Sequence, residues 1–258
     1  MKVISFNANG IRAAARKGFF SWLASENADF VCIQETKAQR EQLAILPEFF
    51  PLGYYCDYFD AVKKGYSGVA IYARVPPTHV QKGFGCQYCD TEGRYLQFDY
   101  PNLSVISLYL PSGSSGPERQ AVKFEVLENF GRHLEKLKTA GKELIICGDY
   151  NIAHRNIDLK NWRGNQKTSG FLPEERAWLG HLFDNIGLID AFRILNQEPD
   201  HYTWWSLRQR AWEKNVGWRI DYQLITPKLV NDLQSVSIYR DQPFSDHAPV
   251  IMTYDVTL

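Results

Sequence analysis

Eight short apolar runs rich in β-branched residues recur along this chain, and they constrain its fold more than any other feature. Each has the length and composition of a buried or half-buried strand. They lie at residues 2–8, 30–35, 68–74, 96–101, 103–111, 143–151, 221–226 and 248–256. Amphipathic patterns of helical period lie between them, at residues 11–26, 118–140 and 173–186. Helices that follow strands predict an α/β class, and the hairpin-like pair of runs at 96–111 adds antiparallel pairing, so we expect mixed sheets packed on each other and covered by helices.

The length and charge of the chain limit its organisation and its partners. Its 258 residues contain no linker rich in proline, glycine or serine, so we expect a single domain over residues 1–258. The 29 basic and 29 acidic residues cancel, and any surface that binds phosphate must therefore be local. The first apolar stretch is too short for a signal peptide and no stretch approaches a membrane span, which predicts a cytoplasmic protein without membrane association. No heptad run or leftover apolar helix face stands out, so we expect a monomer.

The five cysteines form no disulfide or zinc framework. Cys32 and Cys147 lie inside apolar runs, where buried free thiols are common. Cys86 and Cys89 form a CxxC pair, but a structural zinc site needs two further ligands at matching spacing, and only Cys56 remains outside the apolar runs. We therefore expect Cys86 and Cys89 to be ordinary thiols of a surface loop.

A polar GDYN sequence follows one of the apolar runs. Gly148 permits a tight turn, after which Asp149 and Asn151 project on the same side of the backbone. A carboxylate and an amide at this spacing can hold one water, with the acid accepting its proton and the amide orienting it. The same residues also suit a simple turn in which Asp149 and Asn151 cap the loop.

Glu35 emerges from another apolar run onto a polar segment that contains Lys37. A hard divalent cation binds through one or two carboxylates and keeps several waters, so Glu35 with the amide of Asn7 would form a partial metal shell. An ion pair between Glu35 and Lys37 explains the same residues equally well.

His247 lies between Asp246 and the last apolar run, and Asp221 opens the run before it. An aspartate paired with an imidazole fixes its tautomer and supports its protonated form, which can face a phosphoryl oxygen. A single histidine is more often structural, but two nearby carboxylates favour a functional role for His247. Tyr109 ends another run, where a tyrosine is more often half-buried packing, although its phenol would suit a hydrogen bond to a transition-state oxygen.

Two segments mix basic residues with aromatic or amide residues, a composition that suits phosphates and exposed sugars or bases. Residues 158–171 carry Lys160, Arg163 and Lys167 among Asn161, Asn165, Thr168 and Gly170. Residues 202–218 carry Arg208, Arg210 and Lys214 among Trp204, Trp205, Trp212 and Trp218. Solvated charged loops with incidental aromatic residues are the alternative interpretation of both segments.

Taken in order along the chain, these elements resemble one known family. Asn7, QETK, the tyrosine of YLP, GDYN, GWRID and SDHAPV are similar to the motifs of the exonuclease III and AP endonuclease family, within the wider endonuclease/exonuclease/phosphatase fold. The resemblance covers essentially the whole chain. GDxN and SDH alone also occur in relatives that cut phospholipids, phosphoinositides or RNA tails, whereas NVGWRIDY, KTSGF and YTWWS point more narrowly to DNA repair.

The resemblance implies a four-layer α/β sandwich, with two mixed β-sheets packed face to face and helices on both outer sides. It implies metal-dependent hydrolysis of a DNA phosphodiester on the 5′ side of an abasic site, which leaves a 3′-hydroxyl. Exonuclease activity from 3′ to 5′, 3′-phosphatase activity and removal of blocked 3′ ends vary within the family. Mg²⁺ is the implied cofactor, with Mn²⁺ as an alternative, and the implied partner is double-stranded DNA that contains abasic sites or blocked 3′ ends.

The resemblance also assigns catalytic roles to single residues. Asp149, assisted by Asn151, would position and deprotonate the attacking water. Asp221 would orient His247, which with Tyr109 would stabilise charge on the scissile phosphate. The residues implied around the metal are Glu35, Asn7, Asp246, Asp149, Asn151 and His247.

A DNA-binding surface follows from the same resemblance. Trp204, Trp218 and Ile220 would line a pocket for a flipped-out abasic sugar, which selects its substrate by admitting a nucleotide without a base. The further DNA-binding residues implied are Arg12, Lys37, Asn161, Asn165, Thr168 and Arg208.

The chain departs from the family pattern at several positions. Asn9 replaces an aspartate of many relatives, which removes one carboxylate from the metal surroundings and makes a two-metal mechanism less secure. Ser112 and Ser115 stand where some members have an amide residue and an arginine, so phosphate contacts there would be weaker. Thr168 replaces an asparagine. Arg208 occupies the position of a side chain that penetrates the duplex, and we expect it to probe the groove electrostatically.

The sequence leaves three alternative functions open. One is an enzyme of the same family that acts mainly as a 3′ to 5′ exonuclease or 3′-phosphatase. A phosphatase or phospholipase on the same fold is another, favoured by the neutral net charge. The last is a non-catalytic nucleic-acid-binding regulator, against which the intact set of Glu35, Asp149, Asn151, Asp221 and His247 argues.

Overall fold

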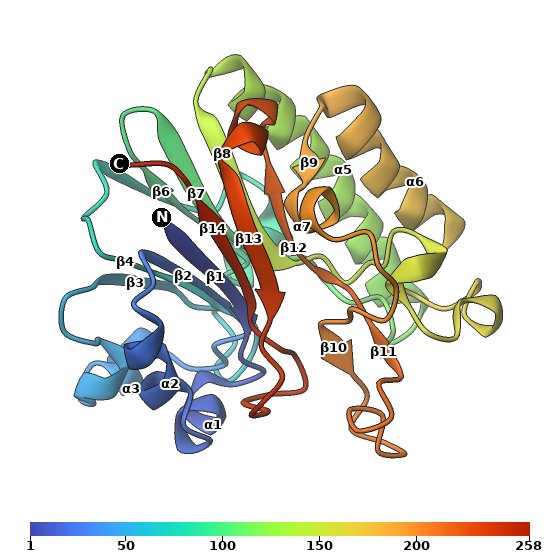
Figure 1. The fold of residues 1–258 in the computed structure, drawn as a ribbon, viewed down its shortest axis with the longest axis horizontal. Helices are drawn as coiled ribbons and strands as arrows, with labels where there is room; N and C mark the ends of the chain where they lie inside the picture. The colour runs from blue at the N-terminus through green and yellow to red at the C-terminus, as the bar shows by residue number, and fades with distance from the viewer.

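Two six-stranded β-sheets form the centre of the molecule in the computed structural model, which describes all residues 1–258 (Figure 1). The first sheet has the order β13 (Leu233–Ile238), β14 (Val250–Tyr254), β1 (Lys2–Asn7), β2 (Phe30–Gln34), β4 (Val69–Ala73) and β3 (Tyr55–Phe59). The second has the order β5 (His79–Lys82), β6 (Tyr95–Asp99), β7 (Leu103–Tyr109), β8 (Glu143–Asp149), β12 (Asp221–Ile225) and β9 (Ile189–Asp190). Strands β1 and β2 are parallel, as are β7 and β8, while the other neighbours are antiparallel, so both sheets are mixed.

Helices cover the outer face of each sheet (Figure 1). The first sheet is covered by α1 (Ile11–Arg16), α2 (Phe19–Glu26) and α3 (Arg40–Leu43). The second is covered by α4 (Gln87–Thr91), α5 (Pro117–Thr139) and α6 (Pro173–His181), which continues into the π-helical turn η4 (Leu182–Ile186). The other helical elements are α7 (Ala191–Leu195) and the short helices η1 (Pro47–Phe49), η2 (Asn156–Asp158), η3 (Trp162–Gly164) and η5 (Pro227–Asp232). The predicted four-layer α/β sandwich is confirmed, and none of its helices has the length and apolar character needed to cross a membrane.

The side chains of the central strands alternate between the two faces of each sheet. In β8, Ile145 and Cys147 pack between the sheets, whereas Ile146 faces the helices. In β2, Cys32 packs between the sheets and Val31 faces the helices on the other side. Both faces of these strands are buried, so they need apolar residues at every position. This is the reason that they are visible in the sequence as continuous apolar runs.

All eight strands predicted from apolar runs are present, and the two runs at 96–111 form the expected hairpin as β6 and β7. The strands of the main sheets that the sequence did not reveal are β3, β5, β9 and β13, and all four are edge strands. An edge strand has one neighbour and exposes much of its length, as the mixed burial of β13 shows, so it lacks a continuous apolar run. The last two strands, β10 (Trp204–Trp205) and β11 (Gly217–Trp218), have two residues each, which is too short for a periodic signal.

Glycines divide or end the predicted helices. The helix predicted over 118–140 is confirmed as α5, which ends just before Gly141. The pattern at 11–26 instead forms two helices, α1 and α2, because Gly18 between them has a left-handed backbone with φ of 90°. The pattern at 173–186 forms α6 and its π-helical turn, which ends at Gly187.

Four of the five free cysteines are buried. Cys32 and Cys147 lie in the central core, as predicted. The prediction that Cys86 and Cys89 lie on a surface loop is wrong, because both are buried in the layer where α4 packs beneath α5. Residues three apart lie on one face of a helix, so a CxxC spacing also suits the buried side of a single helical turn.

Gly148 is required for close strand packing and not for the tight turn predicted from GDYN. It lies inside β8, and a Cβ atom there would lie 2.2 Å from the carbonyl oxygen of Leu108 in the neighbouring strand. Because backbone cannot move aside as a flexible side chain can, we expect Gly148→Ala to lower the free energy of unfolding by about 1–3 kcal/mol, measured by urea denaturation. Gly164→Ala is the matched control, since its Cβ meets nothing within 4 Å. Equal stability of both variants and the wild type would contradict this role of Gly148.

Candidate active site

One edge of the sandwich collects the polar residues that begin or end its strands. Asn7 ends β1, Asp149 ends β8 and Glu35 directly follows β2. Strands β12 and β14 run antiparallel to these strands, so their first residues reach the same edge. Asp221 opens β12 and pairs with Asp149, and His247 precedes β14 and bridges to β10. Residues that are far apart in the sequence therefore meet at the end of the sandwich where β10 and β11 project (Figure 1).

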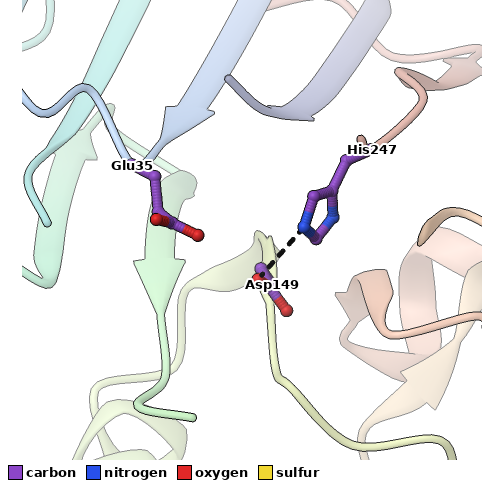
Figure 2. A group of neighbouring side chains, drawn as sticks. All are labelled: Glu35, Asp149 and His247. Atoms are coloured by element: carbon purple, nitrogen blue, oxygen red, sulfur yellow. Dashed lines mark ion pairs between the residues drawn. The ribbon is translucent and has the colours of Figure 1, made fainter. Parts of the chain in front are cut away.

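Glu35, Asp149 and His247 form the centre of this group, with ligand atoms that all lie within 4.8 Å of one another. Figure 2 shows the side chains of Glu35 and His247 extending toward Asp149 from opposite sides. The Nε2 atom of His247 lies 3.9 Å from Oδ2 of Asp149. Asn7 joins the two acids, because its Nδ2 donates to Oε1 of Glu35 at 2.9 Å and to Oδ2 of Asp149 at 2.8 Å.

Glu35 is held as an anion by its neighbours. Its backbone has a left-handed conformation, with φ of 50°, that turns the side chain into the site. Burial opposes ionisation, but the ammonium group of Lys37, 2.8 Å from Oε2, and the amide of Asn7 outweigh it and lower the pKa of Glu35. The ion pair with Lys37 that the sequence left open is therefore present, and it leaves the carboxylate charged and able to meet a cation.

His247 and Asp221 form a buried pair behind this centre. The Nδ1 atom of His247 lies 2.9 Å from Oδ2 of Asp221, so Nε2 is directed at Asp149. Burial works against the imidazolium, but the carboxylates of Asp221, Asp149 and Asp246 outweigh it and raise the pKa of His247 to about 10. The hydroxyl of Thr203, which the sequence did not single out, accepts hydrogen bonds from two backbone amides at the start of β12 and fixes Asp221 there. The pair is suited to donate a proton or hydrogen bond to an oxyanion.

Asp149 lies at the bottom of the group and is buried. Burial, and the negative charges of Asp221 and Glu35, raise the pKa of Asp149 to about 8, against the opposing effect of His247. The backbone amide of Asn151, which has a left-handed φ of 52°, donates to Oδ1 of Asp149 at 2.8 Å. The amide nitrogen of Asn151 donates to the carbonyl of Leu110 at 2.9 Å, which leaves its amide oxygen to bind a water.

The loop after Asp149 is fixed from below by an ion pair that the sequence did not reveal. Lys123 on α5 donates to the carbonyl of Asn151 at 2.8 Å and pairs with Glu175 on α6 at 2.6 Å, and both charged side chains are fully buried. Glu175 also accepts hydrogen bonds from the backbone amides of Gly170 and Leu172. The pair thereby ties the water-orienting loop to the KTSGF segment, and only the helix packing brings its two members together.

Tyr109 is held by a second buried residue that the sequence did not reveal. The guanidinium carbon of Arg94 lies 4.5 Å from the centre of the Tyr109 ring, and Nη1 of Arg94 donates to the Tyr109 carbonyl at 3.0 Å. Burial and the nearby carboxylate of Glu35 raise the pKa of Tyr109 well above its ordinary value. The phenol therefore stays protonated and acts as a hydrogen-bond donor.

A cavity of about 280 Å³ opens above these residues. It is lined by Glu35, Tyr109, Ser112, Ser114, Asp149, Asn151, Thr168, Ser169, Gly170, Trp204, Trp218, Ile220, Asp246 and His247. The rings of Trp204 and Trp218 form one wall, with centroids 6.3 Å apart at an angle of 80°. The structure therefore brings four predicted catalytic residues and the predicted sugar-pocket residues to one cavity, while the fifth, Asp221, lies behind His247.

Of the other predicted DNA-binding residues, Thr168 lines the cavity, whereas Lys37 and four more distant residues lie outside it. Arg12 is exposed on α1, and Arg208 is exposed in the loop that joins β10 and β11. Asn161 and Asn165 flank η3 and are joined by a hydrogen bond from the side chain of Asn165 to the carbonyl of Asn161. Ser115, one of the departures from the family pattern, is also exposed and outside the cavity.

A buried ionic network supports the segment between the tryptophan wall and Asp221. Asp158 accepts hydrogen bonds from Arg219 at 2.9 Å and from Arg193 at 2.7 Å. Arg219 also pairs with Asp190 at 2.7 Å. Burial opposes ionisation of Asp158, but the two guanidinium groups outweigh it and lower its pKa to about 2. From the sequence, Asp158 only began the basic segment 158–171, because its partners in this network lie far from it along the chain.

The centre of the site suits a hard divalent cation. Its carboxylates supply the oxygen ligands that Mg²⁺ prefers. Burial and then the neighbouring negative charges raise the pKa of Asp149, and a cation beside Glu35 would offset those charges. The raised pKa of His247 favours a proton donor over a metal ligand. Asp246 is outside the set of close ligand atoms, and its oxygens accept hydrogen bonds from Asn9 and Trp204.

Comparisons with known proteins agree with this geometry. The family described as Endonuclease/Exonuclease/phosphatase matches residues 4–247. The chain is 38% identical to an exodeoxyribonuclease of Bacillus subtilis (strain 168), over 99% of this chain and 100% of that protein. It is 34% identical to a DNA-(apurinic or apyrimidinic site) endonuclease of Dictyostelium discoideum, over 99% of this chain and 71% of that protein. The solved structure of a 3′-5′ exonuclease (NExo) from Neisseria meningitidis is 26% identical and matches with a TM-score of 0.91, covering 99% of this chain and 100% of that one. This chain therefore belongs to the endonuclease/exonuclease/phosphatase family and, within it, to the exonuclease III and AP endonuclease group of nucleases.

Proposed function

We propose that this protein is a Mg²⁺-dependent DNA-repair nuclease that hydrolyses the phosphodiester on the 5′ side of an abasic site and leaves a 3′-hydroxyl. The observation that carries this proposal is the single cavity in which the acid and histidine cluster lies beside the wall of Trp204 and Trp218. Relatives named as an exodeoxyribonuclease and an apurinic or apyrimidinic site endonuclease support it. One copy of the chain supplies all the residues proposed for the site, which supports a monomeric enzyme.

Asp149 and Asn151 prepare the attacking water in the proposed mechanism. The amide oxygen of Asn151 orients the water, and the carboxylate of Asp149 accepts its proton. Glu35, with Asn7 and Asp149 beside it, would hold the Mg²⁺ ion. Bound Mg²⁺ supplies positive charge that polarises the phosphate for attack.

His247 and Tyr109 act on the phosphate itself. The imidazolium of His247, held by Asp221, and the protonated phenol of Tyr109 both donate to oxygens on which negative charge develops. Donors that are already in place gain strength in the transition state, because no further reorganisation is required when the charge appears.

Selection for an abasic site comes from the cavity walls. Trp204, Trp218 and Ile220 form an apolar wall beside the cluster, which we expect to accept a bare sugar and to exclude a nucleotide that carries its base. Around this space, Thr168 lies in the cavity wall and Lys37 beside Glu35. We propose that Arg12, Asn161, Asn165 and Arg208, which lie outside the cavity, contact the DNA backbone or groove on either side.

Cleavage of a defined duplex tests the proposal. We expect a duplex with one abasic site to be cut on its 5′ side in the presence of Mg²⁺ and to remain intact with a chelator, because the two acids need a counter-cation at the phosphate. A matched normal duplex should remain uncut, and the products are resolved by denaturing gel electrophoresis. Cleavage of the abasic duplex in the chelator, or none with Mg²⁺, would refute the proposed activity.

A second candidate is a 3′ to 5′ exonuclease or 3′-phosphatase of the same family, which the likeness to the Neisseria 3′-5′ exonuclease favours. A duplex with a recessed 3′ end and one with a 3′-phosphate, assayed beside the abasic duplex, separate the two. Faster turnover of either 3′-end substrate than of the abasic duplex would make this the main activity.

A further inference from the structure

The carboxylate of Asp246 accepts hydrogen bonds from two different parts of the site. Its Oδ1 accepts a hydrogen bond from Nδ2 of Asn9 at 2.9 Å, and its Oδ2 accepts one from the indole Nε1 of Trp204 at 3.1 Å. Asn9 lies beside the acid cluster, because its backbone amide donates to Oδ1 of Asn7 and its side chain contacts Lys37, whereas Trp204 belongs to the tryptophan wall. Both oxygens of Asp246 are therefore used as acceptors by donors from opposite sides.

The orientation of Asn9 is fixed by Lys37. The ammonium group of Lys37 donates to Oδ1 of Asn9 and pairs with Oε2 of Glu35 at 2.8 Å. An ammonium group has donors and no acceptor, so the amide oxygen of Asn9 must face Lys37 and its amide nitrogen must face Asp246. An aspartate at position 9 would have no hydrogen to donate and would set two carboxylates against each other. With Asn9 present, Asp246 is surrounded by hydrogen-bond donors and accepts from them as an anion. It has no second carboxylate beside it with which to bind another cation at this position.

Asp246 contacts the ring of Trp204 through its side chain and the backbone next to Trp204 through its carbonyl. The backbone amide of Trp205 donates to the carbonyl of Asp246 at 3.0 Å, and the amide of Ala248 donates to the carbonyl of Thr203 at 2.8 Å. These backbone bonds do not depend on the side chain of Asp246. The bond to Oδ2 is the hydrogen bond that holds the Trp204 indole, whose ring meets the ring of Trp218 edge to face.

We propose that Asp246 is a positioning residue that fixes the Trp204 ring in the wall of the sugar pocket and joins that wall, through Asn9 and Lys37, to Glu35. This role takes the place of the metal contact expected for Asp246 from the sequence. It rests on the proposed function, since it explains how the pocket for an abasic sugar keeps its shape beside the reacting phosphate.

Substitutions at either end of the bond test this role. Asp246→Asn keeps the shape but places an amide nitrogen against either Asn9 or Trp204, and Asn9 cannot rotate to accept because Lys37 holds its oxygen. Trp204→Phe keeps an aromatic wall and removes only the indole N–H donor. Asp241→Asn, an exposed acid on the same loop, is the matched control. Circular dichroism checks folding, and Trp204→Phe tests the same bond if Asp246→Asn does not fold.

The first measurement needs neither metal nor substrate. Each tryptophan gives one indole N–H resonance in a nitrogen–proton correlation spectrum. The resonance present in the wild type and missing from Trp204→Phe is therefore that of Trp204. We expect Asp246→Asn to shift that resonance, and Asp241→Asn to leave it unchanged. An unchanged Trp204 resonance in Asp246→Asn would overturn the proposal.

The second measurement follows cleavage kinetics and metal dependence. We expect Asp246→Asn and Trp204→Phe each to raise KM for the abasic duplex about 10-fold with little change in kcat, and the double variant to resemble the single variants, because both remove one interaction. The Mg²⁺ concentration for half-maximal rate should stay that of the wild type. Additive effects of the two substitutions, or a higher Mg²⁺ requirement in Asp246→Asn, would overturn the proposal. If the wild type does not cut abasic DNA, the proposed function fails, while the indole resonance still decides whether Asp246 holds Trp204.

Discussion

Alanine in place of His247 is expected to lower kcat for cleavage of an abasic duplex by about 10²–10⁴-fold, the range for loss of a positioned proton donor. The imidazolium is buried, held by Asp221 at 2.9 Å and charged at neutral pH, so its full positive charge is available to the developing oxyanion. Single-turnover rates at saturating Mg²⁺ measure the chemical step, and urea denaturation shows whether the variant is folded. Glu35→Ala should lower the rate by a similar factor and also raise the Mg²⁺ requirement.

His79 supplies a matched control for the first prediction. It also pairs with an aspartate, Asp99, at 3.1 Å, but it lies on the edge strand β5 with an exposed side chain. His79→Ala should therefore keep the cleavage rate of the wild type. Full activity of a folded His247→Ala would refute the assigned role of His247, and an equal loss in both variants would show that the effect is not specific to the site.

Removal of the Asp158 carboxylate is expected to lower the free energy of unfolding by about 3–5 kcal/mol. Asp158→Ala leaves Arg193 without its carboxylate partner and Arg219 with only Asp190, and both guanidinium groups are buried. The measurement is urea denaturation near neutral pH. Glu128→Ala is the control, because its ion pair with Arg132 on α5 is exposed and should contribute no more than about 0.5 kcal/mol.

We also expect the Asp158 carboxylate to make the free energy of unfolding depend on pH. The pKa of Asp158 is lowered to about 2 in the folded protein and returns to its ordinary value, near 3.8, on unfolding. A lowered pKa stabilises the folded state at pH above the ordinary value, and this contribution, about 2 kcal/mol, is lost as the pH falls from 4 to 2. Asp158→Asn should lose this part of the acid dependence. A variant whose stability between pH 4 and 2 falls as steeply as that of the wild type would contradict the assignment.

The sequence was most informative about the centre of each sheet. Strands such as β2 and β8 are buried on both faces, so their sequences are continuous apolar runs that can be recognised without a structure. The edge strands β3, β5, β9 and β13 have no continuous apolar run, because half-exposed strands tolerate polar residues. Gly18 is a related case. The helical pattern of side chains at 11–26 does not indicate that the left-handed backbone of Gly18 divides it into two helices.

Some residues of the candidate site could be predicted from the sequence, and others could not. Asp149 and Asn151 could be predicted because they are neighbours in one motif whose spacing has a chemical meaning. The residues that hold them, Lys123 and Glu175, could not be predicted, because a buried ion pair between two helices has no local signature. The same is true of Arg94 behind Tyr109.

The sequence by itself determined that polar residues follow the buried strands, because strand burial and loop chemistry are properties of neighbouring residues. Only the tertiary structure decided that the start of β12 and the residues before β14 reach the edge where β1, β2 and β8 end, since strand direction and order are set by the packing of the whole sandwich. It also decided that Asn9, Asp246 and Trp204 are joined. A hydrogen bond between residues more than forty positions apart depends on where the chain returns in space, and no local pattern records it.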